Sequence, residues 1–272
     1  MTADQWTRAV RRQLGLGRLL PLGGARDGAW ITEHAAAALV RRAADEVPGV
    51  RIGPLRIGPA PTTPHDADTS GRSDGEPAVP PPPSALPPGP LLLTADFTAR
   101  ATAGPLPATA ARLREALARI ATGRLGLTVT DVDLRVTALE EDSPEPARSP
   151  GSVRPSERPP GGGVPPSGSR GAGTAGADPE EPGSEEDRVA AAALAVPGVT
   201  RLTGALGGVG RAVHIERRED DGAGAVPRRH VRVEVAVDAD RRTVEVAREV
   251  RAAVGTALSD RPSVAVLVTA VD

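Results

Sequence analysis

Histidines are the first residues to consider for acid–base or metal chemistry, and the sequence has four: His34, His65, His214 and His230. None is followed by a second histidine at i+4, and none has neighbours with the spacing of metal ligands. His214 and His230 lie on different predicted strands and could meet across a sheet, although a solvated strand face explains both better. The histidines therefore predict neither a metal site nor a catalytic site.

Paired carboxylates are the second candidate for chemistry. Asp131 and Asp133, and likewise Asp238 and Asp240, have the spacing of residues on the wet face of a strand, and Glu140-Glu141-Asp142 resembles a solvated strand end. Two carboxylates held together can do acid–base work, but nothing in the sequence marks a substrate pocket around either pair. We therefore predict no catalytic, cofactor-binding or metal-binding residue, no cofactor and no enzyme activity. An enzyme with an acid pair is the least favoured of three functional hypotheses.

Two glycine motifs could bind nucleotides or RNA. Gly204–Gly210 lacks the G-x-G-x-x-G spacing, no Lys-Ser/Thr follows it, and the next segment is a predicted strand, whereas a phosphate loop needs a helix N-terminus behind it. We interpret it as a hairpin connection. Gly123-Arg124-Leu125-Gly126 spells the GXXG clamp of KH domains, but there the motif joins two helices and here it joins a helix to a strand. We interpret Gly123 as the residue that ends the helix.

The charge balance constrains the partners. All 33 basic residues are arginine and the formal net charge is −2, which argues against general binding of polyanions such as nucleic acid. A group of arginines in the C-terminal part nevertheless keeps lipid or nucleic-acid binding open: Arg211, Arg217, Arg218, Arg228 and Arg229. The excess of Arg, Ala, Gly and Pro is typical of a GC-rich bacterial genome. The absence of cysteine excludes disulfides, zinc–thiolate sites and a thiol nucleophile.

A repeat organises the elements that would position these residues. Val47-Pro48-Gly49-Val50 returns as Val196-Pro197-Gly198-Val199, and each copy ends an Ala-rich helical run and begins a β-prone run. An alternating strand, an amphipathic helix and a Val-rich strand follow each copy. We therefore predict an α+β fold made of two small two-layer α/β modules in α-β-β-α-β order. Their cores must be small, because Trp6, Trp30 and Phe97 are the only aromatic residues.

The first module is predicted to span 28–141. Its helix has Thr32 as N-cap, and the strand Val50 to Ile57 is bent at Gly53-Pro54. Residues 91–100 alternate as a half-buried strand. The next helix follows Gly104-Pro105-Leu106-Pro107 and buries Ala110, Leu113, Leu117 and Ile120, with Glu115 and Arg119 paired on its surface. In the closing strand Val132, Leu134 and Val136 are predicted to face the core.

The second module is predicted to span 185–272. Helices are expected at about 185–195 and 241–258, and strands from Val199, at 211–217, at 230–238 and at 263–271. The last strand is apolar on both faces. We therefore expect it to be central in its sheet, or covered by a second subunit or by the other module.

Three segments lie outside the repeats. Residues 1–27 are predicted to hold a short amphipathic helix with Trp6, Val10 and Leu14 on one face, which could touch a membrane or pack on its own domain. The Pro-rich insertion 59–90 and the Pro/Gly-rich linker 142–184 are predicted to be disordered, so that the linker leaves the orientation of the modules free. Arg11-Arg12 resembles a twin-arginine leader but lacks a convincing cleavage site, and no apolar run reaches the ~18–20 residues of a membrane span. We expect a cytoplasmic protein.

The repeat resembles the alkaline shock protein family of envelope stress response proteins. The matching residues of the first copy are Gly28–Glu33, Ala44–Val50, Gly104–Pro107, Arg112–Ile120 and Thr128–Val136. Those of the second copy are Val196–Val199, Val231–Val237, Val244–Val254 and Val264–Val268, without the G-x-P-L-P turn and with a shorter first helix. The resemblance implies a non-enzymatic scaffold or adaptor at the cytoplasmic face of the membrane. It also implies self-association, or a membrane-anchored partner that makes the membrane contact indirect.

Two other families share V-P-G-V at a helix end. Heavy-metal-associated domains need a cysteine pair, which the chain lacks. Phospholipid-binding BON domains remain an alternative, so lipid or nucleic-acid binding is the second functional hypothesis, although the net charge makes nucleic acid the weaker partner.

Overall fold

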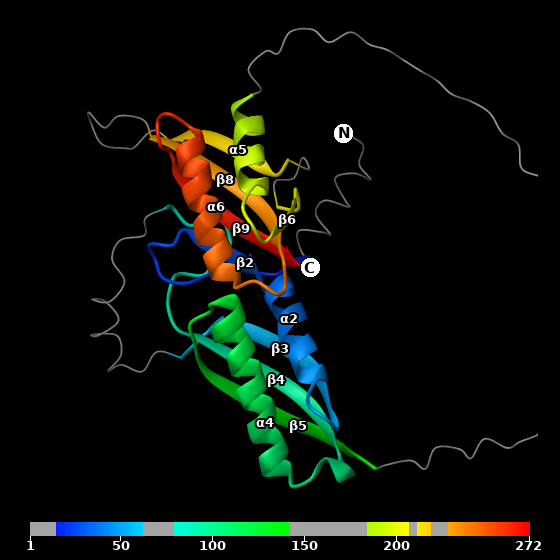
Figure 1. Cartoon of the computed structure of the whole chain (residues 1–272). Coiled ribbons are helices and arrows are strands. Elements are labelled where there is room, and N and C mark those ends of the chain that lie inside the picture. Colours follow the sequence, from blue (N-terminus) through cyan, green and yellow to red (C-terminus); the bar gives the residue numbers. More distant parts are fainter. Residues whose placement is uncertain (1–14, 62–78, 142–183, 207–210, 219–227) are drawn as a thin grey trace, which may run out of the picture.

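The computed structural model describes residues 15–61, 79–141, 184–206, 211–218 and 228–272, which form an α+β fold with mixed sheets (Figure 1). The predicted helix at 3–14, His65 and the linker except Ser184 lie outside the described residues. The elements of the N-terminal half, residues 15–141, are β1 (Leu19–Pro21), β2 (Ala29–Thr32), α2 (Glu33–Asp45), β3 (Val50–Pro59), β4 (Leu91–Arg100), a 3-10 turn (Ala101–Ala103), α4 (Leu106–Ala118), a π-helical extension (Arg119–Leu125) and β5 (Val129–Glu140). Those of the C-terminal half, residues 184–272, are α5 (Glu185–Leu194), β6 (Val199–Leu202), β7 (Val213–Arg218), β8 (Arg228–Val237), α6 (Thr243–Ala257) and β9 (Ser263–Val271).

The smaller sheet has the order β3-β4-β5, with β3 antiparallel to β4 and β4 parallel to β5. The predicted alternation of β4 is confirmed, because the side chains of Leu91, Leu93, Ala95, Phe97 and Ala99 are buried and the residues between them are not. The predicted bend of β3 is also confirmed, since the pairing register shifts between Ile52 and Leu55, on either side of Gly53-Pro54.

The larger sheet has the order β1-β2-β9-β8-β6, and β7 also pairs with β8. β9 lies between β8 and β2 and runs parallel to both. The prediction that β9 is central in its sheet is therefore confirmed, and its position explains why it is apolar on both faces.

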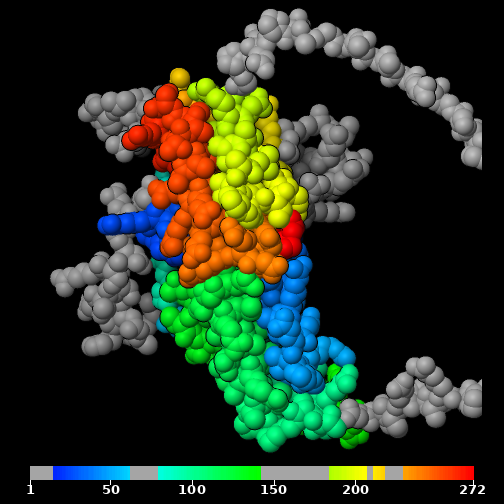
Figure 2. Space-filling view, viewed as in Figure 1, coloured from blue at the N-terminus to red at the C-terminus, as the bar shows by residue number. Residues whose placement is uncertain are grey.

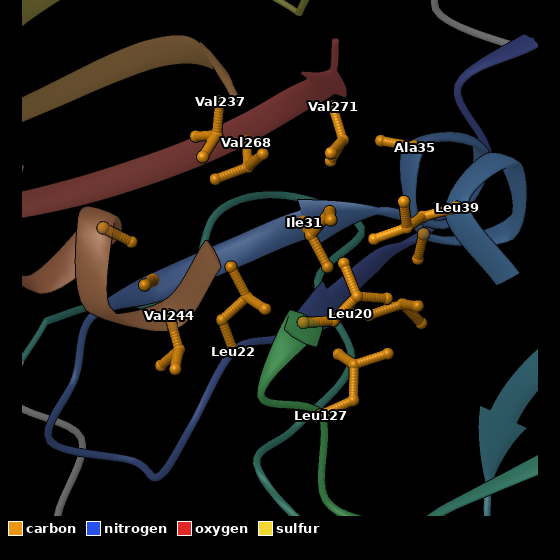
Figure 3. Packing of buried hydrophobic residues seen from close by; sticks show 14 of the residues in the cluster. Leu20, Leu22, Ile31, Ala35, Leu39, Leu127, Val237, Val244, Val268 and Val271 are labelled. Carbon is orange, nitrogen blue, oxygen red and sulfur yellow. The ribbon is translucent and has the colours of Figure 1, made fainter. Parts of the chain in front are cut away.

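The two sheets repeat one topology but share one core. In each, a strand after a helix pairs antiparallel with a second strand, and a helix then leads to a third strand parallel to the second. However, β2 of the N-terminal half belongs to the sheet of the C-terminal half, with Ile31 in register with Val268. Figure 3 shows Leu20, Ile31 and Leu127 packed together with side chains of the C-terminal half. The prediction that the halves have a free relative orientation is therefore wrong.

The proline-rich segment also departs from the prediction. Residues 79–90 were expected to be solvated, but Val79 is buried against Leu19 and Trp30 on the second face of the larger sheet. Leu86 N–H donates to Leu19 O at 2.8 Å, so residues 84–86 extend along the outer edge of β1. The buried side chain of Val79, the partly buried side chains of Ala85 and Leu86, and backbone hydrogen bonds thus hold this segment in place.

Three local predictions can be compared with the structure directly. Thr32 caps α2 as predicted, because its side chain accepts a hydrogen bond from Ala35 N–H. Gly123 does not end the second helix; the π-helical turns continue to Leu125, and Gly126, with a left-handed φ of 85°, ends them. Val136 lies on the helix side of the small sheet, opposite Phe97, as predicted, but its side chain is 36% exposed.

Candidate functional site

The outer face of the larger sheet carries the histidines that the sequence singled out. His214 on β7 lies opposite Arg232 on β8, and His230 lies opposite Glu216, so all four residues share one face and the histidines are diagonal neighbours. His230 Nδ1 lies 2.9 Å from Ser263 Oγ, and His214 Nε2 donates to Arg211 O at 3.1 Å. Burial, and then the charge of Arg232, lowers the pKa of His214.

Glu234 lies on the same face and is fully buried. Its Oε2 accepts hydrogen bonds from the backbone N–H groups of Ala205 (2.7 Å) and Leu206 (2.9 Å). The described start of the glycine-rich loop therefore binds a carboxylate of its own chain, which occupies the amides that a phosphate would need. The prediction that Gly204–Gly210 closes a hairpin is wrong, because β6 and β7 both run antiparallel to β8 and follow one another along the same edge. Residues 207–210 lie outside the described part.

The GXXG sequence joins the two halves. Arg124 donates to Asp240 O, and its guanidinium lies 3.8 Å from the Asp240 carboxylate. Gly126 faces Val244 of α6 so closely that a Cβ there would lie 2.4 Å from Val244 Cγ1. The motif thus forms a docking corner between the end of the π-helical segment and the start of α6. In Figure 2, α4 and its extension (green) lie directly against the C-terminal half (orange).

The candidate acid pairs make local contacts. Asp131 accepts a hydrogen bond from Val132 N–H at 2.7 Å, and both Asp131 and Asp133 are exposed on the outer face of the small sheet. Asp238 accepts one from Asp240 N–H at 2.8 Å in the turn after β8. Glu140 instead pairs with Arg51 across the sheet at 3.0 Å. These contacts are those of local turns and of a solvated sheet face.

Two of the arginines proposed as a basic face are bound by acids of α5. Arg211 lies 3.8 Å from Glu186, and Arg229 bonds Glu185 and also lies 3.3 Å from Asp260. Arg217 is exposed, and the side chains of Arg218 and Arg228 lie outside the described part. The acidic partners reduce the positive potential that would attract a polyanion.

A basic groove that the sequence analysis missed runs along α6. It encloses about 540 Å³ and is lined by Arg248, Arg251, Thr256 and Arg261, among others. Arg248 makes a bidentate pair with Asp27, at 2.8 and 2.9 Å, and Arg251 donates to Arg26 O at 2.7 Å. The sequence does contain a signal for this groove: Arg248 and Arg251 are three residues apart, which places both side chains on one helix face. Arg248 therefore anchors the β1–β2 turn, while Arg251 and Arg261 can meet an anion.

The outer edge of β5 is a second feature that the sequence analysis missed. β5 is 12 residues long, contains neither glycine nor proline, and among the described strands pairs with β4 alone. Val132 C=O accepts from Arg114 Nε at 3.0 Å. The apolar side chains of Val136 and Leu139 are 36% and 61% exposed at its end. A long unpaired edge of this kind is a template for another strand.

The described residues contain no group of three or more His, Cys, Asp or Glu that could hold a metal ion. Within the same ranges, no helix is long and apolar enough to cross a membrane. A scan against protein-family models, a search of curated proteins and a search of solved structures each found no match.

Proposed function

We propose that this protein is a non-enzymatic scaffold that acts through protein–protein contacts. The observation that carries this proposal is the free edge of β5, together with the exposed side chains of Val136 and Leu139. Unpaired strand edges bind extended segments through backbone hydrogen bonds, and exposed apolar side chains next to the edge add specificity. The edge is long enough for such a contact without any rearrangement of the fold.

The acidic and histidine groups support a role without turnover. Glu234 is buried and bound by backbone amides, Asp238 is held in a turn, and His214 is bonded to a backbone carbonyl. A general acid or base must instead reach a substrate proton from an open site. Glu234, Asp238 and His214 instead bond backbone groups of the protein itself, which is a structural role.

The resemblance to the alkaline shock protein family suggests the process and the cellular location in which the scaffold acts. Within the two sheets, β3-β4-β5 and β6-β8-β9 have the same order and strand directions, which supports two copies of one α-β-β-α-β module. In this proposal the protein acts in the envelope stress response at the cytoplasmic face of the membrane. The protein binds further copies of itself and a membrane-anchored protein, and this anchored partner holds it at the membrane.

Flotation through a density gradient tests this function. The full chain is floated in lysate of its native host and, after purification, with vesicles that contain anionic lipid. We expect flotation in lysate and none with pure vesicles, and a Val136→Lys, Leu139→Lys double variant should lose the lysate flotation. Leu194→Lys, which changes an exposed leucine of α5, is the matched control. Flotation of the wild-type chain with pure vesicles, or none in lysate, contradicts recruitment by a membrane protein.

The basic groove supports a second candidate function, binding of an anionic lipid headgroup. Arg251 and Arg261 face a space of about 540 Å³ beside α6. If this candidate is correct, the purified chain floats with anionic vesicles, salt weakens the flotation, and an Arg251→Gln, Arg261→Asn double variant abolishes it. Binding of a single-stranded oligonucleotide in place of vesicles would favour the nucleic-acid alternative.

A further inference from the structure

We infer that β5 pairs antiparallel with β5 of a second copy of this chain, with Leu134 opposite Leu134. This inference rests on the proposed function and names one partner for the free edge. It would join two three-stranded sheets into one sheet of six strands.

The other sheet edges of the described part are protected more fully than the edge of β5, where side chains bond only Val132. β3 contains Pro54 and Pro59, and its Ile57 N–H donates to the Glu33 carboxylate at 3.2 Å. β1 is three residues long and is bonded by residues 84–86. On the opposite edge of the larger sheet, β6 and β7 are separated by a loop. Prolines, short strands and bonded edges are devices against edge pairing, and β5 lacks proline over its whole length.

The faces of β5 restrict the possible registers. Residues opposite each other in an antiparallel pair share a face. Val132, Leu134 and Val136 lie on the helix side of the small sheet, while Asp133 and Arg135 lie on the outer side. A self-pair must therefore be centred on a residue and not between two residues. Over the middle of the strand this leaves three centres: Asp133, Leu134 and Arg135.

The charges select one of the three. Centring on Asp133 places this carboxylate against its own copy, and centring on Arg135 places two guanidiniums together; like charges directly opposite destabilise a sheet. Centring on Leu134 places each Asp133 opposite the Arg135 of the second copy, which gives two pairs of opposite charge. It also places each Val132 opposite a Val136. The strand is thus complementary to itself in this register.

The present contacts of the edge are compatible with this pairing. Val132 N–H donates to Asp131 Oδ1 and Val132 C=O accepts from Arg114 Nε. The N–H and C=O of one residue point to the same edge of a strand, so Val132 faces the free side. In the dimer, the backbone C=O and N–H of Val136 from the second copy would bond Val132 in place of the Asp131 and Arg114 side chains. The pairing would also cover part of the exposed apolar surface at the end of β5.

Disulfide trapping tests the register, because the natural chain has no cysteine. Residues directly opposite in an antiparallel pair have Cα atoms about 4.5–5.5 Å apart, within the range of about 4.4–6.8 Å for a disulfide. The full-length Leu134→Cys variant should therefore form a covalent dimer under mild oxidation. Thr94→Cys, an exposed position of the central strand β4, is the control and should stay monomeric under the same conditions. A wild-type chain that sediments as a dimer while Leu134→Cys does not cross-link would overturn the register.

Charge variants test the pairing itself by sedimentation. Asp133→Arg alone and Arg135→Asp alone each create two like-charge contacts in their own dimers, so we expect each to weaken dimerisation about tenfold. An equal mixture of the two variants should dimerise as the wild type does, because both opposite-charge pairs return in the mixed dimer. No effect of the single changes, or no recovery in the mixture, contradicts the proposed pairing. Unchanged circular dichroism of both exposed-site variants would confirm that they fold.

The same samples separate this inference from the scaffold function. A wild-type chain that is monomeric at all concentrations but floats in lysate would overturn β5 self-pairing and leave the scaffold function in place, with another occupant on the edge. A chain that dimerises through β5 but does not float in lysate would support the self-pairing and contradict recruitment to the membrane.

Discussion

β5 and β9 occupy the same position in the two halves, yet their edges differ. Each follows a helix and runs parallel to the second strand of its repeat. β2 occupies the outer edge of β9, and Trp30 and Val79 cover its second face. Among the described residues, β5 has no strand on its outer edge, and its second face carries Asp131, Asp133 and Arg135. In the same topology, the outer edge of the last strand can therefore pair with a strand of the same chain, as in β9, or be available to a partner, as in β5.

The difference lies in a few residues before the first helix. The β1–β2 segment reaches across to the larger sheet and brings Leu20, Leu22 and Ile31 into the core between the halves (Figure 3). The α5 helix is preceded by Ser184, which caps it with Asp187, and no strand of the described part precedes it in its own half. The N-terminal half thus stabilises the edge of the other half, while no strand within the described ranges pairs with its own outer edge.

The largest expected effect comes from removal of the side chain that holds β2 on β9. Ile31 is fully buried, so Ile31→Ala should lower the free energy of unfolding by about 3–4 kcal/mol, from lost burial and the cavity left behind. Urea denaturation at one fixed protein concentration measures this change. The matched control, Leu194→Ala on the exposed side of α5, should change it by less than about 0.5 kcal/mol. Equal effects of both changes would contradict a structural role of β2.

The second effect concerns the corner where the halves meet. Gly126 has a left-handed φ of 85°, and an added Cβ would approach Val244 Cγ1 to 2.4 Å. Gly126→Ala should therefore cost about 2–3 kcal/mol through backbone strain and overpacking. Gly123, in the helical segment before it, has open space around it, and Gly123→Ala should be neutral or stabilise by up to about 1 kcal/mol. Thermal unfolding of both variants measures the contrast, and equal shifts of Tm would refute the assignment of Gly126 to this corner.

The local pattern of the sequence was sufficient for most elements within each half. The period-two pattern of β4, the cap at Thr32, the bend at Gly53-Pro54 and the apolar β9 all follow from interactions between near neighbours in sequence. The same is true of the pair between Glu115 and Arg119, which the structure places at 2.6 Å. These predictions needed no knowledge of the rest of the chain.

The contacts between the halves could not be predicted in this way. β2 is four residues long, too short for a periodic pattern, and its partner β9 lies more than two hundred residues away in sequence. Val79 is followed by four prolines and belongs to no periodic pattern, so its burial depends on a surface that other segments build. Val136 follows the alternating pattern but is exposed, because burial depends on tertiary packing that alternation does not specify. The candidate grooves and edges arise from such contacts, which is why local patterns did not reveal them.

A third comparison uses the caps of the equivalent helices α2 and α5. Thr32 is buried, accepts from Ala35 N–H and lies 3.4 Å from Thr269 O of β9, whereas Ser184 forms an exposed capping box with Asp187. Thr32→Ala should cost about 1.5 kcal/mol, and Ser184→Ala about 0.5–1 kcal/mol, since only Thr32 also contacts the other half. Chemical denaturation measures both, and the reverse order would argue against the contact with β9.

The smallest effect is the pH dependence of the clasp between Asp27 and Arg248. The hydrogen bonds from Arg248 lower the pKa of Asp27 below its ordinary value of 3.8, and burial opposes this only in part. Because the pKa of Asp27 is lower in the folded chain, the unfolded chain takes up a proton first as the pH falls. The stabilisation from the Asp27–Arg248 pair is therefore present above about pH 4 and decreases as the pH falls through the lower pKa of the folded chain. Asp27→Asn should lower the free energy of unfolding by about 1 kcal/mol near pH 7. Its Tm difference from the wild type should shrink below pH ~4, and Arg248→Gln should behave alike. Because the clasp ties the β1–β2 turn to α6, a difference that persists unchanged at acid pH would mean that the edge of β9 is held without it.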